Sequence, residues 1–119
     1  MKIELPLDGT GATAVRESSD ALFKSRFLLE ILLVIAQEDR FYHGQIVELV
    51  PRAGGGFVTS VLKRYEDANL IRPVQSEAGQ ARRYLEKRQP DHPLWALTPA
   101  WVRFLLEDPP AAVAQLVRP

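Results

Sequence analysis

The chain has 119 residues, of which 46% are hydrophobic and 25% charged, and its formal net charge is zero. This length and composition predict one soluble globular domain. They exclude cysteine chemistry, because the sequence has no cysteine for a disulfide, a thiolate metal ligand or a nucleophile. No stretch is long and apolar enough to cross a membrane and no secretory signal is visible, so we expect a cytoplasmic protein without a membrane partner.

The charges are unevenly distributed along the chain. Between Arg52 and Arg88 there are eight basic and four acidic residues, an excess of four positive charges, and the rest of the chain carries the compensating four negative charges. Such segregation creates a local positive surface on a neutral protein. This positive surface favours a nucleic-acid partner, although a net charge of zero for the whole chain by itself argues against one.

Residues 1–19 are expected to form an N-terminal arm. Pro6 disfavours a central strand in the run KIELPL, and the glycines and threonines of GTGAT indicate a flexible lead. A helix is predicted from about residue 21 to residue 37, after a capping residue among residues 18–20.

This first predicted helix is unusual because Glu30 is the one polar residue between residues 27 and 36. A helix on the outside of a small domain buries one stripe, so a helix that is apolar all round needs cover on both sides. Either this helix is the central helix of the fold, or a second subunit covers its other face. We expect the second subunit, because so short a chain has few other elements to cover the helix. The expected dimer interface consists of Leu28, Leu29, Leu32 and Leu33, while the side facing the rest of the domain consists of Phe27, Ile31, Val34 and Ile35.

Two further helices are predicted over residues 44–50 and 56–68, joined by the Gly-rich turn PRAGGG. The second has a polar, cationic face opposite an apolar stripe at helical spacing, made of Val58, Val61, Leu62 and Tyr65. Asn69 stands where a helix ends in a left-handed residue. Two short helices joined by a tight turn are typical of a helix-turn-helix unit. The alternative for the second helix is an ordinary amphipathic core helix.

Beyond Asn69 the sequence predicts a small β wing. Residues 70–74 (LIRPV) and 94–98 (LWALT) are the expected strands, and the stretch between them is longer than a simple hairpin requires. Phe41 and Tyr42 are a further candidate for a short strand. Thr98 and Pro99 are expected to open a last helix over residues 99–107, and residues 109–119 to form a tail or a short helix.

The order of these parts resembles the winged helix-turn-helix transcriptional regulators, and within them the PadR and MarR groups. The resemblance rests on YHGQI at residues 42–46, VLKRYEDANLI at 61–71, RRY at 82–84 and LTP at 97–99. It implies a mainly α chain with a small β wing (α+β) and a single winged helix-turn-helix domain over residues 20–108. It also implies homodimers that bind double-stranded DNA and respond to a small-molecule or protein effector. The sequence departs from the pattern in its Gly-rich turn, in an insertion over residues 85–93 and in having no long C-terminal dimerisation helix.

The candidate DNA contacts are polar and basic side chains of the predicted reading helix and wing. Lys63 is the candidate for a guanine edge, and the hydroxyls of the same helix are candidates for phosphate. The basic wing residues would reach a phosphate or the minor groove. The full set is Arg52, Thr59, Ser60, Lys63, Arg64, Arg82, Arg83, Lys87 and Arg88, and the alternative for each is a solvated surface residue.

No enzymatic function is predicted, since no nucleophile, base and orienting acid form a recognisable motif. His43 and His92 have no partner at metal-ligand spacing, so no metal or cofactor is expected. We expect His43 at a helix start and His92 in a polar loop. The leading hypothesis is a sequence-specific DNA-binding transcriptional regulator that acts as a homodimer, and the alternative is a winged-helix module that binds another protein.

Overall fold

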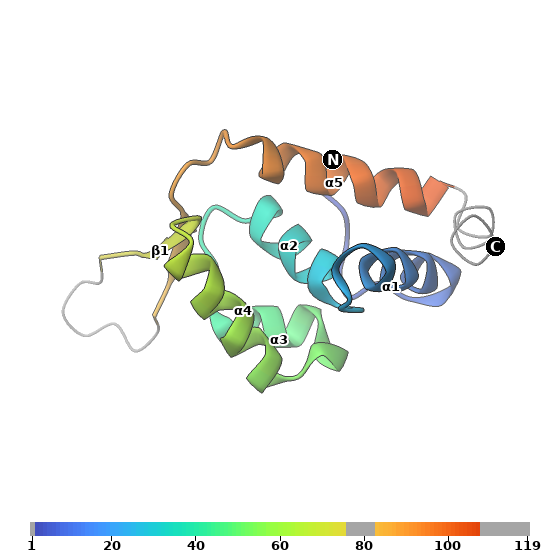
Figure 1. Cartoon of the computed structure of the whole chain (residues 1–119), viewed down its shortest axis with the longest axis horizontal. Helices are drawn as coiled ribbons and strands as arrows, with labels where there is room; N and C mark the ends of the chain where they lie inside the picture. Colours follow the sequence, from blue (N-terminus) through green and yellow to red (C-terminus); the bar gives the residue numbers. More distant parts are fainter. Residues whose placement is uncertain (1, 76–82, 108–119) are drawn as a thin grey trace.

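The computed structural model describes residues 2–75 and 83–107 (Figure 1). This part of the chain is mainly helical with a small two-stranded antiparallel sheet, as the sequence predicts. None of its helices is long and apolar enough to span a membrane. The elements, in chain order, are α1 (Gly9–Phe23), α2 (Leu28–Gln37), α3 (His43–Leu49), the 3-10 turn η1 (Pro51–Ala53), α4 (Gly55–Asp67), β1 (Ile71–Pro73), β2 (Leu85–Lys87) and α5 (Pro93–Glu107).

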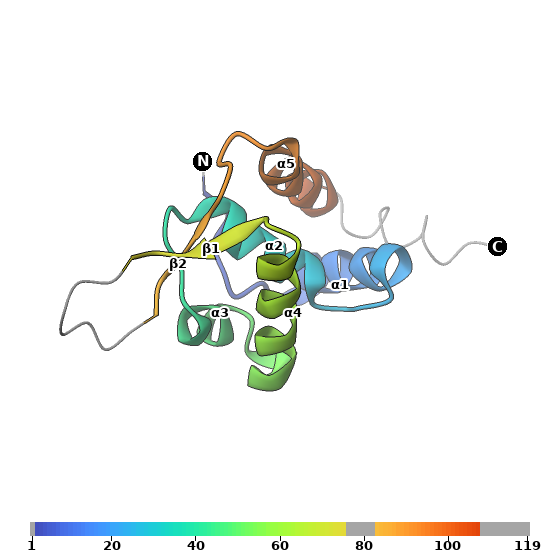
Figure 2. The same cartoon turned by 60° about the vertical axis from the view of Figure 1, so that its left-hand side comes forward.

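Helix α2 is the centre of the fold. It lies between α5 on one side and the α3–α4 pair on the other, with α1 packed at its N-terminal end (Figures 1 and 2). Every residue from Leu29 to Ile35 is buried. Leu29, Leu32 and Leu33 are at most 5% exposed and Leu28 is partly buried against the core, so the expected dimer interface is wrong. The chain's own helices α1 and α5 supply the cover that the sequence analysis assigned to a second subunit.

The predicted N-terminal arm is also wrong, because residues 9–23 form helix α1. Glycine and threonine disfavour a helix, but burial of Ala12, Ala14 and Val15 against the core outweighs this local preference. Gly11 permits a close approach to α5, since a Cβ there would lie 2.7 Å from Leu106 Cδ2. The glycines of this segment therefore belong to a packed helix rather than to a flexible lead.

The single helix predicted over residues 21–37 is divided between α1 and α2. Lys24 closes α1 in the left-handed conformation with φ 55°, and its N–H donates to the Asp20 carbonyl. The Ser19 hydroxyl then accepts from the Leu29 N–H at 3.0 Å and donates to the Ser25 carbonyl oxygen. This buried serine fixes the turn from which α2 starts.

Helix α4 packs on α2 as its apolar stripe predicts. Val58, Val61 and Leu62 are buried in the same cluster as the α2 residues Ile31, Val34 and Ile35. A second cluster on the other side of α2 joins its buried leucines to α1 and α5, and consists of Ala14, Val15, Leu29, Leu33, Val102 and Leu105. Asn69 has φ 62° and follows α4 in the left-handed conformation that the sequence indicates.

The sheet confirms the first predicted strand and corrects the second. Strand β1 pairs with β2 over the register Ile71↔Lys87, Arg72↔Glu86 and Pro73↔Leu85. Phe41 forms an isolated antiparallel bridge to Leu85, so the short strand expected near Phe41 and Tyr42 is reduced to a single paired residue beside the two-stranded sheet. The hairpin therefore returns through residues 85–87, and the predicted wing insertion over residues 85–93 contains its second strand.

Residues 94–98, which were expected to be a strand, lie inside α5. The buried positions Trp95, Thr98, Val102 and Leu105 recur at helical spacing. Thr98 does not cap a helix, because its hydroxyl donates to the Leu94 carbonyl at 2.7 Å within the helix. Pro99, expected to begin the helix, stands in its interior instead, where proline removes one backbone hydrogen bond.

Candidate nucleic-acid interface

The α3–α4 pair is held together at the start of both helices by His43. Its Nε2 lies 2.9 Å from the Gly55 carbonyl oxygen and 3.0 Å from the Thr59 hydroxyl. That hydroxyl also donates to the Gly55 carbonyl at 2.9 Å. His43 is the first residue of α3, as expected, but its link to α4 has no signal in the sequence. Thr59 is exposed, and its hydroxyl is already engaged in this link.

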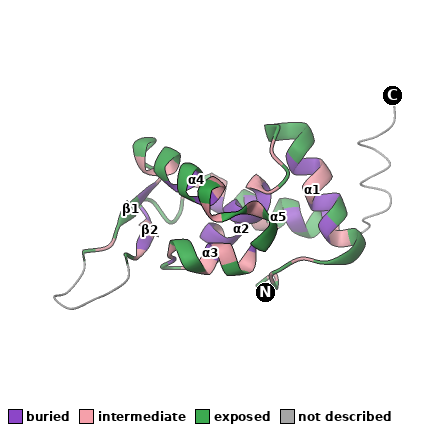
Figure 3. Cartoon of the chain, turned by 90° about the horizontal axis from the view of Figure 1, so that it is seen from below, coloured by how far each residue is buried: buried purple, intermediate pink, exposed green. Residues whose placement is uncertain are grey.

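Helix α4 presents an outward face that no described element covers (Figure 3). Gly56, Ser60, Lys63 and Asp67 recur at helical spacing on this face and all are exposed, opposite the buried stripe. Thr59 flanks it on one side and Arg64 on the other. We call these six residues the α4 face. It places four of the sequence-predicted DNA contacts on a single surface.

Lys63 is a highly accessible cation of the α4 face, with its side chain 78% exposed. Its Nζ lies 3.8 Å from Asp67 Oδ2, one helical turn away. A surface pair of this kind contributes little stability, so an anion of higher charge density can displace the carboxylate. Burial raises the pKa of the neighbouring Tyr65 to about 12, against the opposing effect of the Arg64 charge, and this phenol therefore stays neutral on the inner side of α4.

Arg83 brings the hairpin against α4. Its Nη1 lies 2.9 Å from Glu66 Oε1 and its Nη2 donates to Glu66 Oε2 at 3.1 Å, which is a two-bond contact between guanidinium and carboxylate. Within the described residues, a hollow of about 410 Å³ lies between α3, α4 and β2 and is bordered by His43, Lys63 and Arg83. The arrangement places one predicted wing residue beside the α4 face.

The other predicted contacts have different surroundings. Arg52 in η1 and Arg88 after β2 are exposed, and like Arg64 they pair with no carboxylate among the described residues. The Arg88 N–H donates to the Leu70 carbonyl oxygen at 3.0 Å, which holds the end of the hairpin. Arg82 lies outside the described residues.

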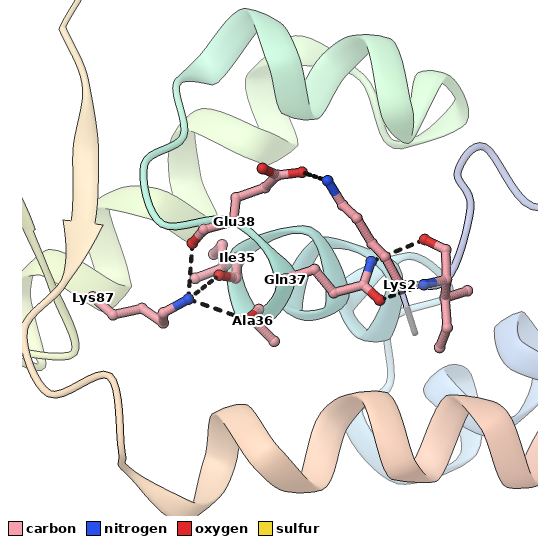
Figure 4. A network of polar contacts seen from close by, with 7 residues as sticks. Lys2, Ile35, Ala36, Gln37, Glu38 and Lys87 are labelled. Carbon is pink, nitrogen blue, oxygen red and sulfur yellow. Dashed lines mark hydrogen bonds and ion pairs between the residues drawn. The ribbon is translucent and has the colours of Figure 1, made fainter.

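Lys87 is not a wing contact, and its prediction is corrected. The residue is 8% exposed, and its Nζ donates to the carbonyl oxygens of Ile35, Ala36 and Glu38 at 2.9, 3.1 and 2.8 Å (Figure 4). These carbonyls end α2 and have no partner within the helix. Burial lowers the pKa of Lys87, opposed by the charges of Asp39 and Glu38. The ammonium group caps α2 and fastens the hairpin to the centre of the fold.

The alternation of a strand provides a sequence signal for the inward direction of Lys87. Residues of a strand alternate between faces, and Leu85 lies on the same face as Lys87, two residues away. Both are buried. Had residues 85–87 been identified as the second strand, the inward direction of Lys87 would have followed.

The chain matches no protein-family model, and neither curated proteins nor solved structures give a significant match. Over residues 2–75 and 83–107, no group of three histidine, aspartate or glutamate side chains could hold a metal ion. His92 lies just before α5, where its Nδ1 accepts from the Leu94 N–H at 3.1 Å.

Proposed function

We propose that the chain is a sequence-specific DNA-binding regulator of transcription with a winged helix-turn-helix fold, in which α4 is the reading helix and the β1–β2 hairpin is the wing. The observation that carries this proposal is the α4 face. A buried apolar stripe holds α4 on the outside of the molecule, and six polar or glycine residues face outward from it. A major groove accepts an α-helix whose outward side chains reach base edges and phosphates.

The order of residues along the α4 face suits this role. Gly56 and Ser60 occupy the N-terminal half, and an added Cβ at Gly56 would meet open space, so the helix backbone can approach a groove closely. The N-cap position of α4 is Gly54, so no side chain there caps the N–H groups of the first helical turn. Uncapped N–H groups at the start of a helix bind phosphate readily. Lys63 then lies within reach of a base edge, and Arg64 and Arg83 lie to either side of it.

The carboxylates of α4 must be displaced when DNA binds. Asp67 pairs with Lys63 and Glu66 with Arg83 in the free protein. A phosphate competes with these carboxylates for the same cations, so binding should depend strongly on salt. Each cation that neutralises a phosphate contributes a slope of about −0.9 in a plot of log affinity against log salt.

The test is titration of the purified chain with a random duplex at low and raised salt, followed by selection of a preferred duplex. Lys63→Ala should relax discrimination between duplexes by about 1–3 kcal/mol. Arg83→Ala should weaken binding to all duplexes alike and flatten the salt dependence. Arg26→Ala, in the connection between α1 and α2, is the matched control and should bind as the parent does. Absence of duplex binding at low salt would contradict the proposal.

The same two ion pairs favour a second candidate function, a module that binds another protein. With Lys63 and Arg83 already neutralised by α4 carboxylates, the surface offers fewer uncompensated charges to a polyanion. A protein partner recognised mainly through apolar contacts would bind with little dependence on salt, whereas DNA binding should weaken steeply. The salt titration therefore separates the two functions.

A further inference from the structure

A hollow of about 450 Å³ lies between the last turn of α2, helix α3 and the N-terminal residues 2–5. This volume is within the range of about 300–1,000 Å³ that is usual for small-molecule sites. Its lining combines apolar side chains with carboxylates and amides, and none of the α4 side chains borders it. The hollow is therefore separate from the α4 face and goes beyond the proposed function.

The N-terminal wall of this hollow is fixed by polar contacts at the end of α2. The Gln37 Nε2 donates to the Ile3 carbonyl oxygen at 2.9 Å, and the Gln37 Oε1 accepts from the Ile3 N–H at 2.7 Å (Figure 4). The Lys2 ammonium group pairs with Glu38. Leu5 is partly buried against both core clusters. The wall is therefore in place before any ligand binds.

The uncompensated charge around the hollow is negative. Three carboxylates line it, those of Glu4, Glu38 and Glu48, together with one cation, Lys2. Lys2 is already paired with Glu38. Glu4 and Glu48 are exposed, and neither forms an ion pair with another described residue. The hollow therefore favours a cation over an anion.

Gln45 adds a hydrogen-bond acceptor without a donor on the α3 side of the hollow. Its Oε1 is buried, and no donor within residues 2–75 and 83–107 bonds to it. A buried acceptor left unsatisfied is unfavourable, and the last torsion of a glutamine side chain is broad, so a small rotation can turn this oxygen toward an occupant. Gln45 and Glu48 are three residues apart in α3, and side chains at this spacing are neighbours. One ammonium group can therefore contact both the amide oxygen and a carboxylate.

We propose that this hollow binds a small organic cation, namely a protonated primary amine on an apolar body. The ammonium group lies between the Gln45 amide oxygen and the Glu48 carboxylate, where each hydrogen bond is charge-assisted. The apolar body lies against Val34 and Leu49, which line the same hollow. Leu49 follows Gln45 by four residues and so shares its side of α3. An anion of the same size finds no unpaired cation in the lining.

The first experiment compares two probes that differ only in their charged group. Tryptamine carries an ammonium group on an indole ring with a two-carbon chain, and indole-3-propionate carries a carboxylate on the same ring and chain. Isothermal titration calorimetry of the full chain, without DNA, should show saturable binding of tryptamine at one site. Indole-3-propionate should bind at least about tenfold more weakly, which corresponds to about 1.4 kcal/mol. Amide NMR spectra should show tryptamine-dependent shifts in α3 and the end of α2.

The second experiment removes the two polar partners one at a time. Gln45→Leu and Glu48→Gln should each weaken tryptamine binding about tenfold or more, because each removes a hydrogen bond to a charged group. Gln45→Leu also removes a buried acceptor that has no donor, so its melting temperature should be unchanged or higher. Asp20→Asn is the matched control, since Asp20 is an exposed carboxylate of α1 that does not line the hollow. It should bind tryptamine as the parent does.

The third experiment reverses the charge of the site. Glu48 is exposed, so Glu48→Lys should fold as the parent does and bind indole-3-propionate more tightly than tryptamine. Three results would overturn the proposal: no saturable tryptamine binding up to the millimolar range, equal affinity of the parent for both probes, or unchanged tryptamine binding by folded Gln45→Leu and Glu48→Gln variants. Because no DNA is present, these results are independent of whether the chain binds DNA.

Discussion

Arg16 reaches from α1 to Glu30, a carboxylate that α2 buries completely. The guanidinium Nε lies 2.9 Å from Glu30 Oε1, and its carbon lies 5.4 Å from the centre of the Phe27 ring. Burial raises the pKa of Glu30 above its ordinary value of 4.5, while the hydrogen bond and charge of Arg16 lower it. The one polar residue of the apolar segment is thus the partner that positions α1.

Arg16→Met should destabilise the protein by about 3 kcal/mol at neutral pH, because it leaves a buried carboxylate without its partner. Both influences that lower the Glu30 pKa come from Arg16, so this pKa should rise further in the variant. The folded state then binds a proton more tightly than the unfolded state, and stability falls as pH rises from about 4.5 through the folded-state pKa. Urea denaturation at several pH values measures this, and the deficit should shrink toward pH 4.5.

The double variant Arg16→Met with Glu30→Met is the control for that prediction. It removes both charges, and replacing a whole buried pair by apolar side chains is often neutral or stabilising. It should recover most of the lost stability and show no such dependence on pH. A single variant that is as stable as the parent at neutral pH would contradict the role given to Arg16.

Lys87 and Arg88 are adjacent basic residues with opposite expected roles. Lys87→Met leaves three carbonyl oxygens at the end of α2 without their donor, so it should cost about 1–3 kcal/mol of stability. Arg88→Met alters an exposed side chain and should change stability by less than about 0.5 kcal/mol. Chemical denaturation measures both. In duplex titrations at a temperature where both variants are folded, Arg88→Met alone should flatten the salt dependence.

At the scale of the element, two helices end in a non-glycine residue with positive φ, Lys24 after α1 and Asn69 after α4. Glycine adopts this conformation without a steric cost, so Lys24→Gly and Asn69→Gly should each raise stability by up to about 1 kcal/mol. Valine at either position should lower stability by about 1–2 kcal/mol because its branched Cβ clashes in this region. Thermal melts of the four variants test whether Lys24 and Asn69 adopt the left-handed conformation. An equal change in melting temperature for glycine and valine would contradict it.

The elements predicted correctly are those whose signal is local. The apolar stripe of α4, the left-handed Asn69 after it and the extended segment that contains β1 can be read over a few residues. Helix α1 forms because Ala14 and Val15 pack against α2 and α5, a contact that no short window of sequence contains. The first half of α5 is not indicated locally, because proline is more usual at a helix start than inside a helix, yet α5 continues through Pro99 with buried positions at helical spacing on both sides.

The same distinction applies to the candidate site. Thr59, Ser60, Lys63 and Arg64 were predicted together because they share one helix. The Arg83 contact with Glu66 and the inward direction of Lys87 depend on how the hairpin folds back, and local patterns do not fix that pairing. The assignment of α2 leucines to a dimer failed for a similar reason. The sequence showed that α2 needed cover, and the structure identifies the chain's own helices as that cover.

At the scale of the whole molecule, the described chain has two surfaces of different chemistry. The α4 face is polar and partly cationic, whereas α1 and α5 expose five large hydrophobic side chains: Leu22, Phe23, Leu97, Trp101 and Phe104. The central helix α2 packs against α4 on one side and against α1 and α5 on the other, and the two sides belong to different core clusters. This arrangement keeps the surface that we propose to contact DNA apart from the exposed hydrophobic residues of α1 and α5.

The homodimer that the family resemblance implies leads to one prediction about DNA binding by the variant Leu97→Glu. We expect the exposed hydrophobic residues of α1 and α5 to form the contact between the two copies, so a charge at Leu97 should weaken the dimer. A dimer that holds one half-site with its first reading helix presents the second at high effective concentration, so a duplex with two half-sites binds far more tightly than a duplex with one. Leu97→Glu should therefore lose affinity for the two-site duplex and about half of its salt slope, yet bind a single half-site as the parent does. Ala96→Glu, at an exposed position of the same helix, should match the parent on both duplexes. Fluorescence anisotropy of the three proteins with the two duplexes measures the six affinities, and equal losses on both duplexes would indicate that Leu97 acts on α4 itself rather than through the dimer.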